Sequence, residues 1–235
     1  MRSSLQTSNI IAICGLKCSG KDTAANMLYY LLNTPKWLHS YKWFRFFQGK
    51  TLRKKWSLTA FAKPLKETLS IILNKPIEWF EDRDNKENCY VHLPSLQIYK
   101  KEVLGQEIIL SENKFLKIVK SNEPIPEEYF ISIRQLMQYY GTNVIRKFLG
   151  DKTWINAALS GNNKIIVSDL RFRTEYTEIK NRNGLTIYIK RDSAVPGNHS
   201  SEREVIDLYN EGKFDYIVEN NGSLEDLFNN LKQII

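Results

Sequence analysis

A glycine-containing stretch near the amino end has residue types and spacing that indicate chemistry. It runs Gly15-Leu-Lys-Cys-Ser-Gly20-Lys21-Asp22-Thr23 and fits the pattern G-x-x-x-x-G-K. In this pattern the glycines let backbone amides turn inward around a phosphate, and the lysine reaches the β- and γ-phosphates. The stretch therefore predicts a polyphosphate site, while the reaction carried out there stays open.

The residue after the lysine departs from the usual pattern. Ser or Thr commonly stands there and binds Mg²⁺, whereas this chain has Asp22, with Thr23 one position later. A carboxylate also suits Mg²⁺, so Asp22 is either a metal ligand or a favourable acid at a helix N-terminus. Asp169, after an apolar run at 165–167, is a second acidic candidate near Mg²⁺, with N-capping of the next turn as its alternative.

Downstream arginines are candidates for neutralising charge on a transferred phosphoryl group. Arg171 lies just past a predicted strand, and Arg191 lies at the end of the next one. Because the carboxyl ends of parallel strands meet at one edge of a sheet, both should share a cleft with the glycine-containing loop. Arg173 is equally well interpreted as a solvated surface residue. Two more candidates lie on one predicted helical segment: Arg134 and Arg146.

Predicted strands and helices alternate along the chain and would position these residues. Strands are expected at 10–14, 56–61, 164–168, 185–190 and 216–219. Helices are expected at 22–35, 63–73, 133–148, 151–160, 175–183, 201–212 and 223–235, with Ser132 capping the third and Gly141 interrupting it. The alternation predicts an α/β fold with a parallel five-stranded sheet flanked by helices.

The composition is that of a folded globular chain. Of 235 residues, 42% are hydrophobic and 26% are charged. We expect one domain over 1–235, with an insertion at about 75–129, where the pattern breaks up and a strand pair lies around 91–103. The formal net charge of +8 favours anionic ligands, whether a small phosphate or a nucleic acid.

Short apolar runs and three cysteines bear on location and redox state. Apolar runs span about five residues, against roughly 20 for a membrane span, and no secretory leader pattern precedes them. Cys14, Cys18 and Cys89 lack partners that would complete a zinc site, so we expect reduced thiols. These features predict a cytoplasmic protein with no membrane partner.

Residues 37–56 combine aromatic and basic side chains without a clear period. In one interpretation they bind nucleic acid, with aromatics stacking on bases and cations meeting phosphates. In the other, which we favour, the aromatics pack on the core and the lysines stay solvated. Nucleic acid is therefore not expected as a partner, and a non-enzymatic nucleic-acid-binding protein is an alternative function.

Taken together and in order, the motifs resemble those of phage and viral deoxynucleoside monophosphate kinases, a branch of the P-loop kinases. Gly15 to Thr23 resembles G-x-x-x-S-G-K-D-T, and residues 61–66 resemble F-A-D-P-L-K with Lys63 replacing the acid. The family's series R-x-x-L-Q, G-T, R and W is matched in order by residues starting at Arg134, Gly141, Arg146 and Trp154. Two further motifs are matched later in the chain, D-x-R-F-x-x-E from Asp169 and H-x-S-E from His199. The resemblance covers most of the chain outside the insertion.

This resemblance implies a P-loop kinase fold and transfer of the γ-phosphoryl group of ATP, with Mg²⁺, to a deoxynucleoside monophosphate. Lys21, Arg171 and Arg191 are then the catalytic residues, and a lid is expected at about 191–202. The implied ATP site is Gly15, Lys17, Ser19, Gly20, Lys21, Asp22 and Thr23. The implied acceptor site is Lys63, Arg134, Gln138, Thr142, Arg146, Trp154 and Glu175. The metal candidates are Asp22, Thr23 and Asp169.

Several alternatives stay open beside this resemblance. Phosphomevalonate and dephospho-coenzyme A kinases share the loop and the architecture, so another small-molecule kinase is an alternative function. Lys63 cannot contact a metal as the family's acid would, although it can pair with phosphate. A homodimer and the accepted bases are left undecided, and a viral source would make the location the host cytoplasm.

Overall fold

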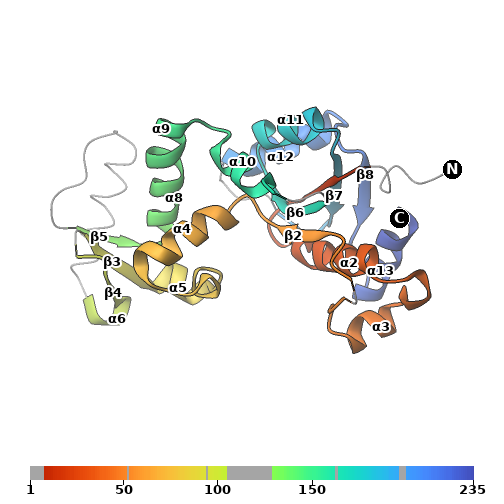
Figure 1. Cartoon of the computed structure of the whole chain (residues 1–235), viewed down its shortest axis with the longest axis horizontal. Coiled ribbons are helices and arrows are strands. Elements are labelled where there is room, and N and C mark those ends of the chain that lie inside the picture. The colour runs from red at the N-terminus through yellow and green to blue at the C-terminus, as the bar shows by residue number, and fades with distance from the viewer. Residues whose placement is uncertain (1–7, 52, 94, 105–128, 162–163, 196–199) are drawn as a thin grey trace. The chain divides into compact units, whose positions relative to one another are not determined.

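The computed structural model describes residues 8–51, 53–93, 95–104, 129–161, 164–195 and 200–235 (Figure 1). The chain divides into two compact units. Unit 1 comprises Met1–Phe61 and Ile155–Ile235, and unit 2 comprises Ala62–Trp154. None of the helices within the described ranges is long and apolar enough to cross a membrane. The single kinase domain with an insertion at about 75–129 and a lid at about 191–202 stays a prediction, and residues 196–199 of that lid, including His199, lie outside the described residues.

Unit 1 contains a sheet of five parallel strands in the order β2-β6-β1-β7-β8. The strands are β1 (Ile10–Cys14), β2 (Ser57–Thr59), β6 (Ile165–Leu170), β7 (Leu185–Lys190) and β8 (Tyr216–Glu219). The predicted parallel five-stranded sheet is therefore confirmed. β2 is shorter than the predicted strand at 56–61, because Trp56 precedes it as a core residue and the chain turns into a helix after Phe61.

Helices cover both faces of this sheet, as alternation of buried side chains along β1 requires (Figure 1). Ile11 and Ile13 pack in one core cluster with α2 (Lys21–Asn33) and α13 (Leu224–Gln233). Ala12 and Cys14 point into the other cluster. That cluster is completed by α10 (Thr153–Leu159), α11 (Arg173–Asn181) and α12 (Ser200–Asn210). The sheet is thus buried on both sides.

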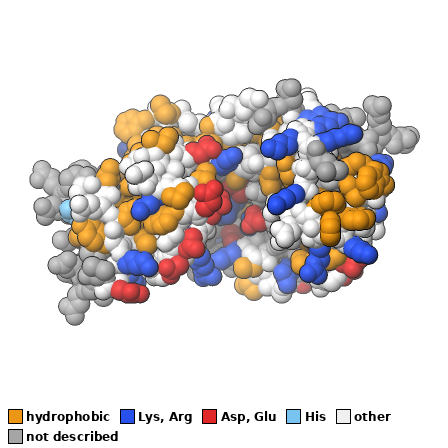
Figure 2. Space-filling model, turned by 60° about the horizontal axis from the view of Figure 1, so that its bottom comes forward, with side chains coloured by type: hydrophobic (Ala, Val, Ile, Leu, Met, Phe, Trp, Pro, Cys, Tyr) orange, Lys and Arg blue, Asp and Glu red, His pale blue; other side chains and the backbone are white. Residues whose placement is uncertain are grey.

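The basic aromatic segment of unit 1 folds into η1 (Lys36–Leu38) and α3 (Tyr41–Phe46). Its aromatic side chains fall into two groups. Tyr41, Phe44 and Phe47 pack against the core and Trp56 belongs to it, which confirms the favoured interpretation for these four. The other three are exposed, so that interpretation is wrong for them: Trp37 at 74%, Phe46 at 71% and Trp43 at 38%. Figure 2 shows hydrophobic side chains among Lys and Arg on the surface of unit 1.

Unit 2 contains an antiparallel sheet in the order β4-β3-β5. Its strands are β3 (Cys89–Leu93), β4 (Gln97–Lys100) and β5 (Tyr129–Ser132). The predicted strand pair around 91–103 is confirmed, while β5 was not expected because four residues show no clear period. Around the sheet lie α4 (Lys63–Leu73), η2 (Ile77–Phe80), α5 (Arg83–Asn88) and α6 (Lys101–Leu104). α4 has the predicted bounds.

A continuous helical stretch of unit 2 changes its winding at Gly141. α8 (Ile133–Tyr139) passes into the π-helical η3 (Tyr140–Arg146) and then α9 (Lys147–Leu149). Ser132 caps α8 as predicted, since its hydroxyl accepts from the Gln135 amide. A Cβ on Gly141 would lie 3.2 Å from Leu65 Cδ2. The predicted interruption is therefore a change of winding, and the glycine leaves room for the Leu65 side chain of α4.

Candidate active site

The loop between β1 and α2 forms a tight turn at the amino end of the helix. Within it, the Ser19 amide donates to the Leu16 carbonyl at 3.1 Å. Gly20 stands at the N-cap, and its carbonyl accepts the first helical hydrogen bond from the Ala24 amide at 2.9 Å. The first amides of a helix lack partners within it and stabilise a negative charge. The amino end of α2 thus suits an anion.

Both glycines of the motif are required by geometry. Gly20 has φ of 88°, a left-handed conformation that side chains rarely adopt. A Cβ on Gly15 would collide with the Ser19 hydroxyl and lie 2.9 Å from the Ile189 carbonyl oxygen. The loop can therefore keep this shape only with glycine at these two positions.

Ser19 has a buried hydroxyl in the middle of the loop. Its side chain is 1% exposed, and its Oγ has no hydrogen-bond partner among the residues the structure describes. A buried polar group without a partner costs free energy, so such groups usually bind a ligand or water. The arrangement fits a phosphate oxygen next to the loop.

Charged side chains of both signs lie near the carboxyl end of β1. The register of the sheet pairs Cys14 with Leu170 of β6 and with Tyr188 of β7. Burial raises the pKa of the Cys14 thiol to about 12, and the charge of Glu175 adds to this shift, whereas the Gly15 backbone and the nearby charges of Lys21 and Arg171 oppose it. Two of the three predicted catalytic residues therefore lie within electrostatic reach of the end of β1.

Asp169 lies within β6 and next to the end of β2. Its Oδ1 accepts a hydrogen bond from the Phe61 amide at 2.6 Å. α11 has Phe172 as its N-cap residue, so the interpretation of Asp169 as an N-cap is wrong. The physical reason is that β6 continues to Leu170 before the chain turns.

The remaining arginines of unit 1 differ in their contacts. Arg191 directly follows β7 and is exposed. Arg173 is exposed too, but its guanidinium donates to the Glu211 carboxylate, with Nη1 3.0 Å from Oε2. That hydrogen bond raises the pKa of Arg173 and lowers the pKa of Glu211. Arg173 is thus a surface residue, as the alternative interpretation has it, and it is held in an ion pair with Glu211.

Four of the predicted acceptor residues follow one another along the helical stretch of unit 2. They are spaced four residues apart, which keeps neighbours on one side of a helix. The first three are exposed and the fourth is partly buried: Arg134, Gln138, Thr142 and Arg146. Arg134 Nε donates to Glu87 Oε1 at 2.9 Å.

The other three predicted acceptor residues have different surroundings. Lys63 begins α4, and its Nζ lies 3.8 Å from Glu67 Oε1. Trp154 is buried, and its Nε1 donates to the Gly141 carbonyl at 3.0 Å. Glu175 belongs to unit 1 and is 3% exposed, and its Oε2 accepts from the Arg171 amide at 2.8 Å. Roles for all three in acceptor binding stay predictions.

Lys66, Lys86 and Arg134 lie in a charged cluster of unit 2 that no motif in the sequence predicted. Lys66 contacts Glu81 at 3.1 Å. Burial, followed by the charges of Lys66 and Arg134, lowers the pKa of Lys86. Two carboxylates, Glu81 and Glu87, pair with Lys66 and Arg134 and oppose the lowering of the Lys86 pKa, so this group of three cations and two carboxylates has a small excess of positive charge. The aperiodic sequence around 75–88 gave no signal that Lys86 would meet Arg134.

Candidate metal ligands in unit 1 are oxygen donors. Asp22 is exposed in the first turn of α2, next to Thr23. Across the described part of the chain, no three His, Cys, Asp or Glu side chains form a group that could hold a metal ion. Mg²⁺ in nucleotide sites takes one or two protein ligands together with substrate phosphates, so this donor set fits it.

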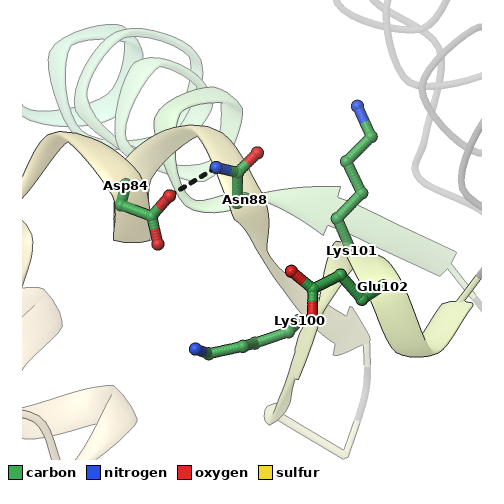
Figure 3. A pocket seen from close by; sticks show the side chains of 5 residues that line it. All are labelled: Asp84, Asn88, Lys100, Lys101 and Glu102. Carbon is green, nitrogen blue, oxygen red and sulfur yellow. Dashed lines mark hydrogen bonds between the residues drawn. The ribbon is translucent and has the colours of Figure 1, made fainter.

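Unit 2 also contains a hollow of about 220 Å³ lined by Asp84, Asn88, Lys100, Lys101 and Glu102 (Figure 3). Two of its polar groups bind each other, since Asn88 Nδ2 donates to Asp84 Oδ1 at 2.6 Å. None of the predicted site residues lines it.

The sheet has five parallel strands, and a glycine-containing loop leads from the carboxyl end of its central strand, β1, into α2. This arrangement defines an α/β fold of the P-loop kinase type. The chain belongs to the deoxynucleotide monophosphate kinase family, whose sequence profile matches residues 9–231. No curated protein matches the chain. It is accordingly a phosphotransferase that acts on deoxynucleoside monophosphates, which selects this activity over the phosphomevalonate and dephospho-coenzyme A alternatives.

Proposed function

We propose that residues 15–23 form a P-loop that binds the triphosphate of ATP, whose γ-phosphoryl group passes to a deoxynucleoside monophosphate. The observation that carries this proposal is the loop itself. A left-handed glycine, a buried unpaired Ser19 hydroxyl and the amino end of α2 converge there. Each is a feature that stabilises bound phosphate oxygens. The ATP-binding residues would be Gly15, Lys17, Ser19, Gly20, Lys21, Asp22 and Thr23.

Phosphoryl transfer depends mainly on alignment and on neutralising charge. In this proposal Lys21 holds the β- and γ-phosphates. Arg171 and Arg191 neutralise charge on the phosphoryl group as it moves. No general base is needed, because the attacking phosphate oxygen of the acceptor is already a nucleophile. The electrostatic influence of Lys21 and Arg171 on Cys14 supports their common location.

Mg²⁺ is part of the proposal, with Asp22, Thr23 and Asp169 as the residues that would hold it. Bound Mg²⁺ would bridge phosphate oxygens of ATP and neutralise their charge. Asp169 also holds the end of β2 through the Phe61 amide, so its carboxylate has a fixed orientation.

For the acceptor nucleotide we propose Lys63, Arg134, Gln138, Thr142, Arg146, Trp154 and Glu175. Support is strongest for Arg134, Gln138 and Thr142, which are exposed on one side of the helical stretch. We add Lys66 and Lys86 to this set. They lie near Arg134, and the three cations outnumber the carboxylates of Glu81 and Glu87 that pair with Lys66 and Arg134, so the group would attract the monophosphate.

The location and source belong to the proposal as well. We propose a cytoplasmic enzyme, because all three cysteines are free in the structure. The resemblance to phage and viral enzymes supports a viral source, and the location would then be the host cytoplasm.

Cys18 provides a direct test, because it is the exposed cysteine within the loop, whereas Cys14 and Cys89 are buried. We expect ATP with Mg²⁺ to slow alkylation of Cys18 by iodoacetamide at least about tenfold, since bound phosphates cover the loop. Peptide mass spectrometry measures the rate. A deoxynucleoside monophosphate alone should leave it unchanged.

The matched control is Lys21→Ala, which keeps Cys18 exposed but removes the main phosphate contact. In this variant ATP should give little protection at the same concentration. Equal alkylation rates with and without saturating ATP in the unaltered protein would contradict the proposed P-loop.

A further inference from the structure

Two consecutive asparagines after β8 contact both parts of the proposed donor site. Asn220 is 7% exposed, and its Nδ2 donates to the Ser19 carbonyl at 2.7 Å, across 201 residues of sequence. Its own amide donates to the Lys190 carbonyl at 2.7 Å. Asn220 therefore joins the proposed P-loop to the end of β7.

The loop is shaped to receive this side chain. A Cβ at Gly20 would collide with Asn220 Nδ2. Gly20 thus serves two purposes, the left-handed backbone and the space for the amide. A buried carbonyl without its donor costs free energy, so loss of the Asn220 amide should shift the loop toward other conformations.

Asn221 makes a similar contact on the other side. Its Nδ2 donates to Asp192 Oδ2 at 2.8 Å, and its Oδ1 accepts from the Asp192 amide at 2.8 Å. Asp192 directly follows Arg191, so these paired hydrogen bonds fix the backbone that carries the arginine. The bonds are exposed, which makes them weaker than the buried contact of Asn220.

We infer that Asn220 and Asn221 are positioning residues for phosphoryl transfer: Asn220 sets the shape of the ATP-binding loop, and Asn221 sets the orientation of Arg191. This inference rests on the proposed function for what the two elements bind. The contacts themselves are independent of it. Neither residue needs to touch substrate, because each acts through a backbone group of its neighbour.

The first test needs no activity. Hydrogen–deuterium exchange of the ligand-free protein should be at least about tenfold faster over residues 14–21 in Asn220→Ala, while α11 exchanges as before. Asn220→Asp, which keeps the shape but cannot donate to a carbonyl, should show the same change. Asn229→Ala, at an exposed position of α13, is the matched control and should leave both regions unchanged. Unchanged exchange over 14–21 in both Asn220 variants, or equal acceleration in α11, would overturn the inference.

The second test separates the two asparagines kinetically. Asn220→Ala should raise KM for ATP about 10- to 100-fold and leave KM for the acceptor within about twofold. Asn221→Ala should lower kcat about three- to tenfold with little change in KM for ATP. Because Asn221 acts through Arg191, adding Asn221→Ala to Arg191→Ala should cause no further loss. Additive losses, or a KM for ATP unchanged by Asn220→Ala, would overturn it.

Together with the Cys18 alkylation test, these two tests distinguish a failure of this inference from a failure of the proposed function. If ATP fails to protect Cys18 in the unaltered protein, the proposed function fails, whatever the exchange data show. If ATP protects Cys18 but Asn220→Ala changes neither exchange over 14–21 nor KM for ATP, the inference alone fails.

Discussion

Arg171, Arg173 and Arg191 show how neighbouring residues of one type can differ in role. Arg173 is engaged with Glu211, whereas Arg171 follows Leu170, the register partner of Cys14 beside the proposed P-loop. Charge on a transition state is neutralised only by groups positioned near it. The three side chains should therefore respond differently to truncation.

We predict that Arg171→Ala and Arg191→Ala each lower kcat roughly 10²- to 10³-fold, as expected for removal of a charge that stabilises the transition state. Arg173→Ala is the matched control and should lower kcat less than about threefold. Steady-state kinetics at saturating substrates provides the measurement. Equal losses for Arg171→Ala and Arg173→Ala would remove Arg171 from the catalytic set.

At the scale of elements, the contact between η1 and α2 contains a buried histidine. His39 Nε2 lies 3.0 Å from the Thr34 carbonyl oxygen. Burial lowers the pKa of His39 below its ordinary value of 6.5, and the charges of Lys232 and Lys36 lower it further. The unfolded chain therefore binds a proton more readily than the native one as pH falls below about 6.5.

We thus predict that acidification from pH 7.5 to 5.5 lowers the free energy of unfolding, in part through His39. Stability should be lost below the unfolded pKa and level off once the native pKa is passed. His39→Gln should show a smaller difference between the two pH values in urea unfolding. The same pH difference in both proteins would exclude this role for His39.

The packing of α3 against α13 provides a second prediction at this scale. Phe228 is fully buried and contacts the rings of Tyr30, Tyr41 and Phe44. Phe228→Ala should lower the free energy of unfolding by about 3–5 kcal/mol, because it removes apolar contacts and leaves a cavity. Phe46→Ala, at an exposed position of α3, should change it by less than about 0.5 kcal/mol. Urea denaturation of both variants tests the difference, and similar losses would contradict the packing described.

The elements that the sequence predicted best are those with strong local signals. β1, α2 and α4 followed from β-branched runs, the spacing of apolar residues and Pro64 in a first helical turn. β5 and α5 were missed, because segments of four and six residues show no reliable period. The π-helical turn at Gly141 was expected only as an interruption, because a glycine in a helical pattern does not specify the kind of winding, and the nearby Leu65 is far away in sequence.

The candidate site divides in the same way. The proposed P-loop was recognised from its local pattern, and Arg171 from its position after a strand. Asn220 and Lys86 were missed because their importance depends on partners distant in sequence, Ser19 for one and Arg134 for the other. No periodicity or motif encodes such a contact. Asp169 was recognised, but its bond to the Phe61 amide, 108 residues away, was not.

At the scale of the whole molecule, the predicted roles divide between the two units. The proposed ATP-binding residues belong to unit 1, and the proposed acceptor residues, apart from Glu175, belong to unit 2. The net charge of +8 over the whole chain favours anionic substrates such as the two nucleotides. The proposed reaction therefore uses residues of both units and two nucleotides.

Coupled ADP release with ATP, Mg²⁺ and each of the four deoxynucleoside monophosphates in turn tests this claim most directly. We predict acceptor-dependent ADP formation with at least one of the four, none without Mg²⁺, and a loss of at least about 100-fold in Lys21→Ala. Dephospho-coenzyme A and phosphomevalonate should be inactive as acceptors. ADP formation with one of these two, and with none of the deoxynucleotides, would contradict the account.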